Sequence, residues 1–469
     1  MSTEDLCYTP ATELASRIRD KDISPVEVTD AVLERIERLE PKINAFATLT
    51  AQSAREAARE AEAAVMRGDD LGPLHGVPTT IKDLHLVAGV PMERGSYIMQ
   101  GNVPESDAPF VTRLKDAGAV ILGKTTTPEY GWKGVSQSPL TGITSNPWKL
   151  GYNAGASSAG AGAGAAAGFG PLHQGSDGAG SIRMPSHFSG VFGLKPSYGR
   201  IANWPVSNGD QTSHIGPMTR TVADAALMLQ VASGAHPLDH YSLESPPADY
   251  PALLGEGVRK LKIAYSPDLG HARVDPDVAA LVADAVKVFE DLGCSVEEVT
   301  PEFGPVGPDL IRFFWTVHEA TLGKHLAQWE EKMDPGLVAC IRAGRGNSAE
   351  DYLAMRARKL AYVEQIHRFL QEWDLLLTPA VSVAAFPADR LQPEHWPQHP
   401  WDWIMWAEFS YPFNMSGSPA ASIPCGFTAE GLPVGLQIVS HRFDDLGVLQ
   451  AAAAFEQVRP WAQHRPPID

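Results

Sequence analysis

Cysteine is scarce in this chain of 469 residues. The cysteines stand far apart and form no C-x-x-C pair, which argues against a disulfide framework and a structural zinc site; they are Cys7, Cys294, Cys340 and Cys425. His236 and His240 have the spacing of one helical turn, but Pro237 beside them is typical of a loop. We therefore expect no metal.

Basic residues are also fewer than acidic ones. Lysine and arginine number 38 against 56 aspartates and glutamates, which gives a formal net charge of −18. This surplus of negative charge repels the phosphates of nucleic acids and anionic lipid heads, so we expect neither a nucleic-acid partner nor a membrane partner. The first residues, MSTEDLC, are acidic and lack the basic segment of a secretory signal, which predicts a cytoplasmic protein.

A strongly apolar run long enough to span a membrane is missing as well. Residues 150–176 carry no charge and are numerous enough to raise the question of a transmembrane helix. They are mostly glycine and alanine, with little of the leucine, isoleucine or phenylalanine that favours insertion. The span is better interpreted as a buried, tightly packed segment.

Glycine and proline, by contrast, are in modest excess. They number 42 and 38 and show no period of three, so the chain is neither collagen-like nor disordered. Residues 131–200 hold 16 of the 42 glycines, far more than an even spread would place there. The excess therefore marks one region of the chain.

The order of apolar patterns predicts an α/β fold. Short β-branched runs, such as 77–81 and 119–122, alternate with helical patterns such as 110–117. The proline-rich stretch 236–257 indicates a linker or a lobe boundary, and the same alternation resumes after it.

Several single elements can be predicted more closely. Ser24 is followed by proline and, three residues later, by glutamate, which indicates a helix over about 25–38. The charged, alanine-rich residues 51–67 predict a solvated surface helix. Residues 422–424 and 435–439 are candidate strands, and 387–406 is typical of a long loop.

Candidate chemistry is concentrated in residues 151–190. The turn-rich run 175–181 can aim several backbone N–H groups at one point, as in an oxyanion hole, and Ser181 at its end is well placed as a nucleophile. The hydrolase elbow G-x-S-x-G is absent around Ser157, Ser158 and Ser181, so a Ser-His-Asp triad has no support.

A buried lysine is the alternative base. Lys82 ends the apolar run 76–81, and burial lowers a lysine pKa because it disfavours the ammonium form. The same pattern also fits a surface lysine at the end of a strand.

Three motifs, in this order, resemble the amidase signature family: GPLHGVPTTIKDL at 72–84, GASSAGAGAGAAAG at 155–168 and GSDGAGSIRMP at 175–185. The resemblance extends from about residue 8 to 460. It implies an α/β fold with a large, mixed, twisted central sheet flanked on both faces by helices. It also implies a single domain over 1–469, with a signature core at about 65–235, a variable lobe at about 258–400 and a return to the core sheet at about 405–460.

The resemblance also implies roles for particular residues. Lys82 would be the base, Ser157 the relay serine and Ser181 the nucleophile, with a cis peptide bond between Ala156 and Ser157. The oxyanion hole would consist of the backbone N–H groups of Gly178, Ala179, Gly180 and Ser181. Where the family more often has GGSSGGS and GTDTGGS, this chain has alanine at several positions, namely Ala156, Ala159, Ala161 and Ala179.

Other residues have two interpretations each. Ser158 either joins the catalytic network or caps the glycine- and alanine-rich helix. Asp177 and Arg183 are expected to hold the nucleophile loop as an ion pair. The resemblance aligns Tyr130, Gly131 and Trp132 with a loop that lines the acyl pocket of the family. The cluster Trp401, Trp403 and Trp406 would form an aromatic wall opposite it; alternatively, the tryptophans are packing anchors.

The sequence thus predicts a cofactor-free amidohydrolase with a Ser-cisSer-Lys triad. Its substrate would be a small molecule with an aryl or alkyl amide, as for an aryl acylamidase, or with a carbamate, as for a urethanase. It would act as a monomer or homodimer. The alternatives are the amidase subunit of a glutamine-dependent tRNA amidotransferase, a catalytically silent scaffold, and a nucleotide-binding oxidoreductase that uses the GxGxxA match at 162–167.

Overall fold

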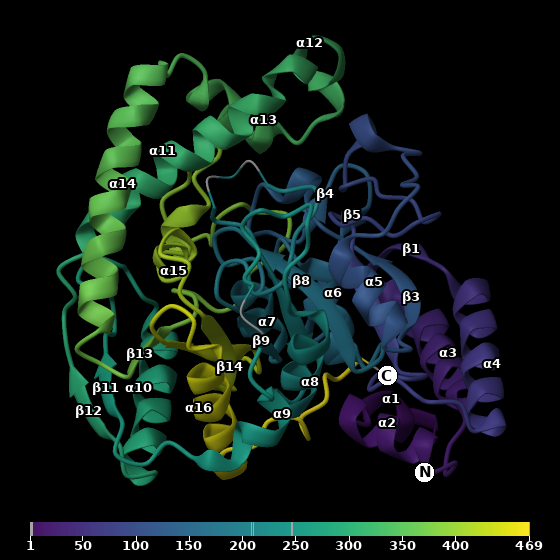
Figure 1. The fold of residues 1–469 in the computed structure, drawn as a ribbon. Helices are drawn as coiled ribbons and strands as arrows, with labels where there is room; N and C mark the ends of the chain where they lie inside the picture. Colours follow the sequence, from purple (N-terminus) through teal and green to yellow (C-terminus); the bar gives the residue numbers. More distant parts are fainter. Residues whose placement is uncertain (1–2, 208, 210, 245–246, 469) are drawn as a thin grey trace.

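The centre of the molecule is a mixed sheet of eleven strands. The computed structural model describes residues 3–207, 209, 211–244 and 247–468 (Figure 1). The strands lie in the spatial order β1 (Phe46–Leu49), β3 (Val120–Thr125), β2 (Pro78–Lys82), β8 (Leu172–Asp177), β10 (His214–Thr219), β9 (Phe192–Lys195), β14 (Ala420–Phe427), β15 (Pro433–Val439), β13 (Leu375–Pro379), β11 (Lys262–Tyr265) and β12 (Ser295–Glu298). The expected large mixed sheet is confirmed.

Strand direction divides this sheet into three parts. Strands β3, β2 and β8 are parallel to one another, as are β13, β11 and β12 at the other side. Strands β10, β9, β14 and β15 between them pair antiparallel. Two small ribbons lie outside the sheet, one of β4 (Gln137–Ser138) with β5 (Gly142–Ile143) and one of β6 (Ser145–Asn146) with β7 (Lys149–Asn153).

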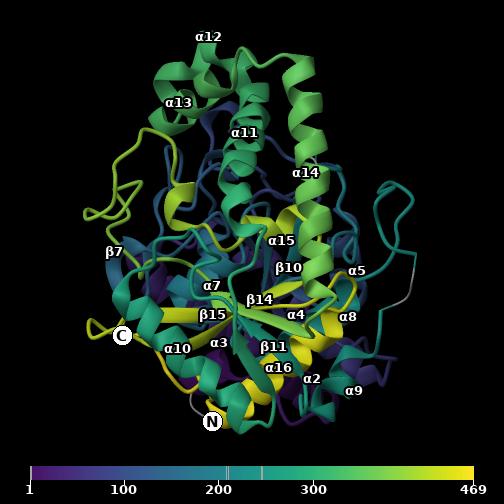
Figure 2. The same cartoon turned by 90° about the vertical axis from the view of Figure 1, so that its left-hand side faces the viewer.

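Helices cover both faces of the sheet (Figures 1 and 2). They are α1 (Thr3–Tyr8), α2 (Ala11–Arg19), α3 (Pro25–Ile43), α4 (Ala51–Arg67), α5 (Pro109–Asp116), α6 (Ala159–Ala167), α7 (Arg183–Ser189), α8 (Val222–Ala232), α9 (Tyr250–Leu253), α10 (Pro276–Asp291), α11 (Gly307–Ala320), α12 (Leu326–Trp329), α13 (Pro335–Gly344), α14 (Ala349–Leu370), α15 (Tyr411–Met415) and α16 (Asp445–Val458).

Several local predictions are confirmed. Ser24 forms the expected capping box with Glu27 at the start of α3, and residues 51–67 are the helix α4. The strand predictions at 77–81 and 435–439 correspond to β2 and β15. The segment 387–406 contains no helix or strand other than a single turn of 3-10 helix near its end.

Successive side chains along each strand point to opposite faces of the sheet. In β2, Ile81 belongs to the core cluster packed by α2, α5, α8, α10 and α16, so the side chain of Lys82 points to the opposite face. In β10, Ile215 joins that same cluster, whereas Met218 packs with Ala161 of α6. The face that carries Lys82 is therefore the face covered by α6 and α7.

Helices α11 to α14 stand beyond the sheet, at the top of Figures 1 and 2. Their chain segment lies between β12 and β13, within the predicted variable lobe, but the strands of that lobe belong to the same sheet as the signature core. The division into core and lobe stays a prediction. In the described part of the chain, no helix is long and apolar enough to span a membrane.

The helix α6 allows the closest packing in this part of the fold. All nine of its residues, AGAGAGAAA, are buried, as expected for the uncharged span. A Cβ on Gly160 would collide with the backbone carbonyl oxygen of Ala45 and lie 2.6 Å from the Thr126 nitrogen. Glycine at this position therefore sets the distance between α6 and the neighbouring backbone.

We expect Gly160→Ala to lower the free energy of unfolding by about 1–3 kcal/mol, because the backbone that a Cβ would meet cannot rotate away. Thermal melting checks this. Gly255→Ala is the control, since nothing lies within 4 Å of a Cβ there. An unchanged melting temperature for Gly160→Ala would contradict the packing argument.

Candidate active site

The site lies where two parallel strands end. Strands β2 and β8 are neighbours, and they end at Lys82 and Asp177 on the same edge of the sheet. The N-terminus of α6, with Ser157 and Ser158 just before it, is at the same place. Polar groups gather at such carboxyl ends because the chain leaves the sheet there.

The side chain of Lys82 is fully buried, and its amine contacts three serines. Nζ lies 2.8 Å from Ser157 Oγ, 3.0 Å from Ser158 Oγ and 3.1 Å from Ser176 Oγ, with the Ser176 carbonyl oxygen at 3.3 Å. The backbone N–H of Lys82 donates to Gln174 Oε1, which fixes the end of the strand.

Lys82 has no carboxylate partner among the described residues. The adjacent Asp83 pairs with Lys124 instead, at 3.2 Å between Oδ1 and Nζ. Burial holds the pKa of Lys82 well below its ordinary value, and the more distant charge of Asp177 opposes this only in part. Burial therefore favours the neutral amine, the form that can accept a proton.

Ser158 belongs to this network. It occupies the N-cap position of α6, but its side chain makes no capping hydrogen bond. Its Oγ instead donates to the Ser176 carbonyl oxygen at 3.1 Å and accepts from the Ser176 N–H at 3.1 Å. The network interpretation therefore holds, and the capping interpretation does not.

Ser157 faces the cavity at the other side of the lysine amine. It is 4% exposed, and the peptide bond that joins it to Ala156 is cis, as the resemblance implied. Gly155 before it has φ +81°, and a Cβ there would collide with Pro185. Close contact between this turn and α7 therefore depends on glycine.

Ser181 stands at the tip of the turn between β8 and α7, and lines the same cavity as Ser157. Ser157 comes from the segment just before α6, and Ser181 comes from the segment just before α7. The hydroxyl of Ser181 forms no hydrogen bond in the part of the chain that the structure describes. It is therefore free to meet a ligand.

The turn is held by the ion pair of Asp177 and Arg183, which is fully buried. Arg183 donates to both carboxylate oxygens at 2.9 Å, and also to the Ser410 carbonyl oxygen and the Gln437 and Asn414 side chains. Burial alone would raise the pKa of Asp177, but the guanidinium lowers it below its ordinary value. The pair supports the expected scaffold role.

One predicted oxyanion donor is already in use. The N–H of Gly180 donates to Asp177 Oδ1 at 2.6 Å, so it is not available to a ligand, and the expectation for this amide is corrected. The amides of Gly178, Ala179 and Ser181 make no hydrogen bond among the described residues. Ala179 has no positive φ, whereas Gly180 has φ +113°, so alanine in place of glycine costs no strain at 179.

A cavity of about 610 Å³ opens over Ser157, Ser176 and Ser181. Tyr130 and Gly131 line it, and a Cβ on Gly131 would lie 3.1 Å from Ser157 Oγ. This volume lies in the range of small-molecule sites.

Trp132 does not line this cavity. It is fully buried and packs against Gly336 of α13, and its carbonyl oxygen accepts from the indoles of Trp315 and Trp403. Trp403 and Trp406 are likewise buried and contact each other, with ring centroids 5.8 Å apart. The structure therefore places Trp132, Trp403 and Trp406 in the core as packing anchors, whereas Trp401 is partly buried against the same core. None of the four lines the cavity, so its aromatic lining comes from other residues.

Of the aromatic residues singled out in the sequence, Tyr130 lines the cavity, whereas other aromatic residues that line it escaped the sequence analysis. Trp204 comes from the loop after β9, and Phe314 and Trp315 come from α11. Arg94 and Glu319 also line it, and neither is in an ion pair within the described residues. The only signal for α11 was an amphipathic pattern far from the motifs, which does not specify what the helix covers.

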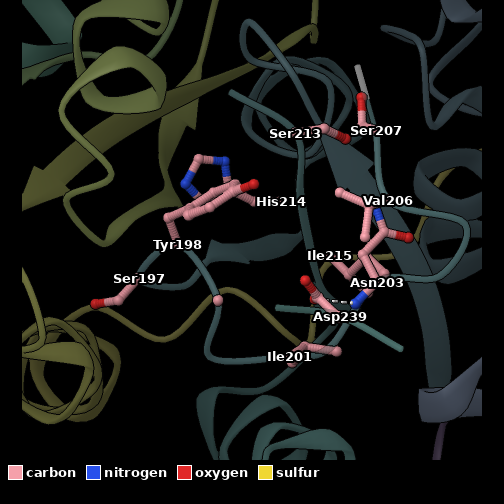
Figure 3. A pocket seen from close by; sticks show the side chains of 11 residues that line it. Ser197, Tyr198, Ile201, Asn203, Val206, Ser207, Ser213, His214, Ile215 and Asp239 are labelled. Carbon is pink, nitrogen blue, oxygen red and sulfur yellow. Dashed lines mark hydrogen bonds between the residues drawn. The ribbon is translucent and has the colours of Figure 1, made fainter. Parts of the chain in front are cut away.

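A second, smaller pocket adjoins the main cavity (Figure 3). Both are lined by Asn203 and Ser207, while His214 and Asp239 line only the smaller one. Its volume of about 10 Å³ corresponds to about one water molecule. His214 Nε2, buried at this place, lacks a hydrogen-bond partner among the described residues.

The dinucleotide interpretation is wrong. Residues 162–167 lie inside α6, whereas a dinucleotide fingerprint needs its first glycines in a turn between a strand and a helix. His236 and His240 belong to no cluster that could hold a metal, and the described residues contain no such cluster elsewhere.

Known proteins of similar sequence and structure fit this geometry. A family model described as Amidase matches residues 27–449. An acylamidase of Rhodococcus erythropolis is 38% identical over 99% of this chain and 98% of its own, and a glutamyl-tRNA(Gln) amidotransferase subunit of Moorella thermoacetica is 35% identical over 99% of each. The crystal structure of a bacterial aryl acylamidase of the amidase signature family superposes with a TM-score of 0.91 at 30% identity, over 97% of both chains.

We expect Arg183→Met to destabilise the protein by about 3–5 kcal/mol, because it leaves the buried Asp177 carboxylate without its cation. Chemical denaturation measures this. Arg342→Met removes an exposed pair with Glu330 and should cost only about 0–1 kcal/mol. Equal effects of the two substitutions would contradict the role given to the buried pair.

Proposed function

The chain belongs to the amidase family, and we propose that Lys82, Ser157 and Ser181 carry out its hydrolysis of carboxamide C–N bonds. It is a hydrolase that acts on C–N bonds other than peptide bonds. The proposal concerns which groups do the chemistry and which amides are accepted.

One observation supports the proposal above all others. A fully buried lysine amine, with no carboxylate partner among the described residues, lies 2.8 Å from a serine hydroxyl in the floor of a cavity. A lysine can act as a base only when it has lost its proton, and burial favours that loss because it lowers the pKa of Lys82 well below its ordinary value.

In the proposed acylation step, Ser181 Oγ attacks the substrate carbonyl carbon. Ser157 Oγ takes the proton of Ser181 and passes its own to Lys82 Nζ. The carbonyl oxygen gains negative charge and accepts from the free amides of Gly178, Ala179 and Ser181. The relay then runs backwards: Lys82 returns its proton through Ser157 to the amide nitrogen, the C–N bond breaks and the amine leaves.

Deacylation repeats this sequence with water. A water molecule that enters after the amine has left gives its proton to the same relay and attacks the ester carbon. The acid is released when Ser181 Oγ recovers a proton. Over the two halves of the reaction, one amide and one water give one amine and one acid, and Lys82, Ser157 and Ser181 return to their starting protonation states.

The lining of the cavity favours aryl or bulky alkyl amides. Trp204, Phe314 and Trp315 present apolar surface that suits a ring, and a carbamate offers the same carbonyl carbon to Ser181. The relatives named acylamidase and aryl acylamidase support this choice over the glutamine-dependent amidotransferase, whose glutamine is small and polar. We retain the expectations of a monomer or homodimer and of a cytoplasmic location.

Replacing Ser181 by alanine should abolish hydrolysis of an anilide without changing the melting temperature. A fluorophosphonate should label the wild-type chain at Ser181 and leave the variant unlabelled. Ser186→Ala is the matched control, because the hydroxyl of this buried serine in α7 lies outside the cavity and has no hydrogen-bond partner among the described residues. Near-normal turnover by Ser181→Ala would disprove the assignment.

Lys82→Met should lower kcat/KM by about 10²–10⁴, the usual effect of losing a general base. In the wild-type enzyme, kcat/KM should rise with pH as Lys82 loses its proton and level off well below the ordinary lysine pKa, because burial lowers that pKa. A pH profile measures this. A plateau reached only above about pH 10 would show a lysine of ordinary pKa and contradict the mechanism.

A further inference from the structure

The α11 wall of the cavity contains a carboxyl group that the proposed mechanism does not use. Glu319 is only 3% exposed, yet it lines the cavity together with Phe314, Trp315 and Leu322. Within the described part of the chain, its carboxyl group has neither a hydrogen bond nor an ion pair.

Two other buried carboxyl groups, by contrast, have hydrogen-bond or ion-pair partners within the protein. Glu129 accepts from Ser96 Oγ at 2.6 Å and from the Asp334 N–H at 2.7 Å. Glu408 pairs with Arg312 and accepts from Tyr411. The carboxyl oxygens of Glu319 are not among the fully buried atoms that lack a partner, so they are open to the cavity, and we expect their partner to come from what fills it.

The surroundings keep Glu319 neutral. Burial raises its pKa to about 8, and the charge of Glu129 adds to this. Its position next to the last residue of α11 has the same effect, since the C-terminal end of a helix disfavours negative charge. Burial also lowers the pKa of the adjacent His318, so that side chain is neutral too.

Arg94 lines the same cavity without an ion pair among the described residues, but its charge is not among the causes that shift the pKa of Glu319. Two other basic groups of the surrounding segments are already engaged. Lys133 pairs with Asp334 at 2.6 Å, and Arg312 pairs with Asp402 at 2.6 Å. The carboxyl group therefore meets the cavity as an acid with its proton, which offers one O–H donor and one carbonyl acceptor.

We propose that Glu319 is a specificity-determining residue whose carboxyl group hydrogen-bonds a neutral polar group of the substrate beyond the scissile amide. The oxygen of a ketone, an ether, a second amide or a carbamate could accept a hydrogen bond from the Glu319 O–H. The inference rests on the proposed function, because it assumes that the substrate occupies the cavity over Ser181.

The test compares Glu319→Gln and Glu319→Leu on matched anilides. In the first pair, one anilide has an acetyl group on the ring and the other has an ethyl group there. In the second pair, one anilide has a ketone in the acyl chain and the other has a methylene at the same place. For each enzyme, the ratio of kcat/KM between the two members of a pair cancels effects of the variant that do not involve the acceptor. Glu319→Leu should lower this ratio about three- to tenfold in one pair, the loss expected for one neutral hydrogen bond. Glu319→Gln keeps a hydrogen-bond donor, so its ratio of kcat/KM should stay within about twofold of the wild-type ratio.

Two results would overturn the inference. An unchanged ratio for Glu319→Leu in both pairs would mean that Glu319 does not contact substrate. A preference of the wild-type enzyme for an ammonium-bearing anilide, lost in Glu319→Gln, would mean that the group acts as an anion. Glu319→Met replaces the leucine variant if that variant does not fold.

Labelling separates this inference from the proposed function. Both variants should still react with a fluorophosphonate at Ser181, because Glu319 has no part in activating the nucleophile. Absence of labelling in the wild-type enzyme would contradict the proposed function, whereas normal labelling with an unchanged ratio would contradict only the role of Glu319.

Discussion

The arrangement of this site depends on keeping one lysine amine out of water and away from negative charge. Lys82 lies on the α6 face of the sheet, and the acidic residue next to it, Asp83, is neutralised by Lys124. The other carboxylate nearby, Asp177, is neutralised by Arg183. Each ion pair places a cation beside a carboxylate near the lysine, and burial outweighs the remaining effect of Asp177, so that the pKa of Lys82 lies well below its ordinary value.

Small residues make this exclusion of water possible. The helix α6 approaches the backbone of Ala45 so closely that Gly160 has no room for a Cβ. The turn before Ser157 is packed against α7 in the same way. Larger side chains would separate these segments and admit solvent beside the amine. Glycines in residues 131–200 therefore allow the close packing around the buried amine.

The sequence predicted the reactive groups better than it predicted the walls around them. Lys82, Ser157, Ser158 and Ser181 are brought together as the motifs implied, because each motif is a short segment with its own local geometry. Trp132 and the Trp403 cluster were candidates for substrate contact, yet they are buried, since an aromatic residue carries no local sign of which surface it will face. Phe314 and Glu319 were missed because α11 reaches the cavity only through long-range packing. The use of the Gly180 amide by Asp177 also depends on three-dimensional geometry that spacing does not reveal.

The origin of the cavity walls has an evolutionary consequence. The floor, with its base and serines, is built by residues 82–181, whereas one wall is a single helix from a segment more than a hundred residues later. Substitutions at the positions of α11 that face the cavity need not disturb the ion pairs near Lys82. New substrate ranges can therefore arise in this scaffold by changes to α11 alone, with the bond-breaking machinery inherited intact.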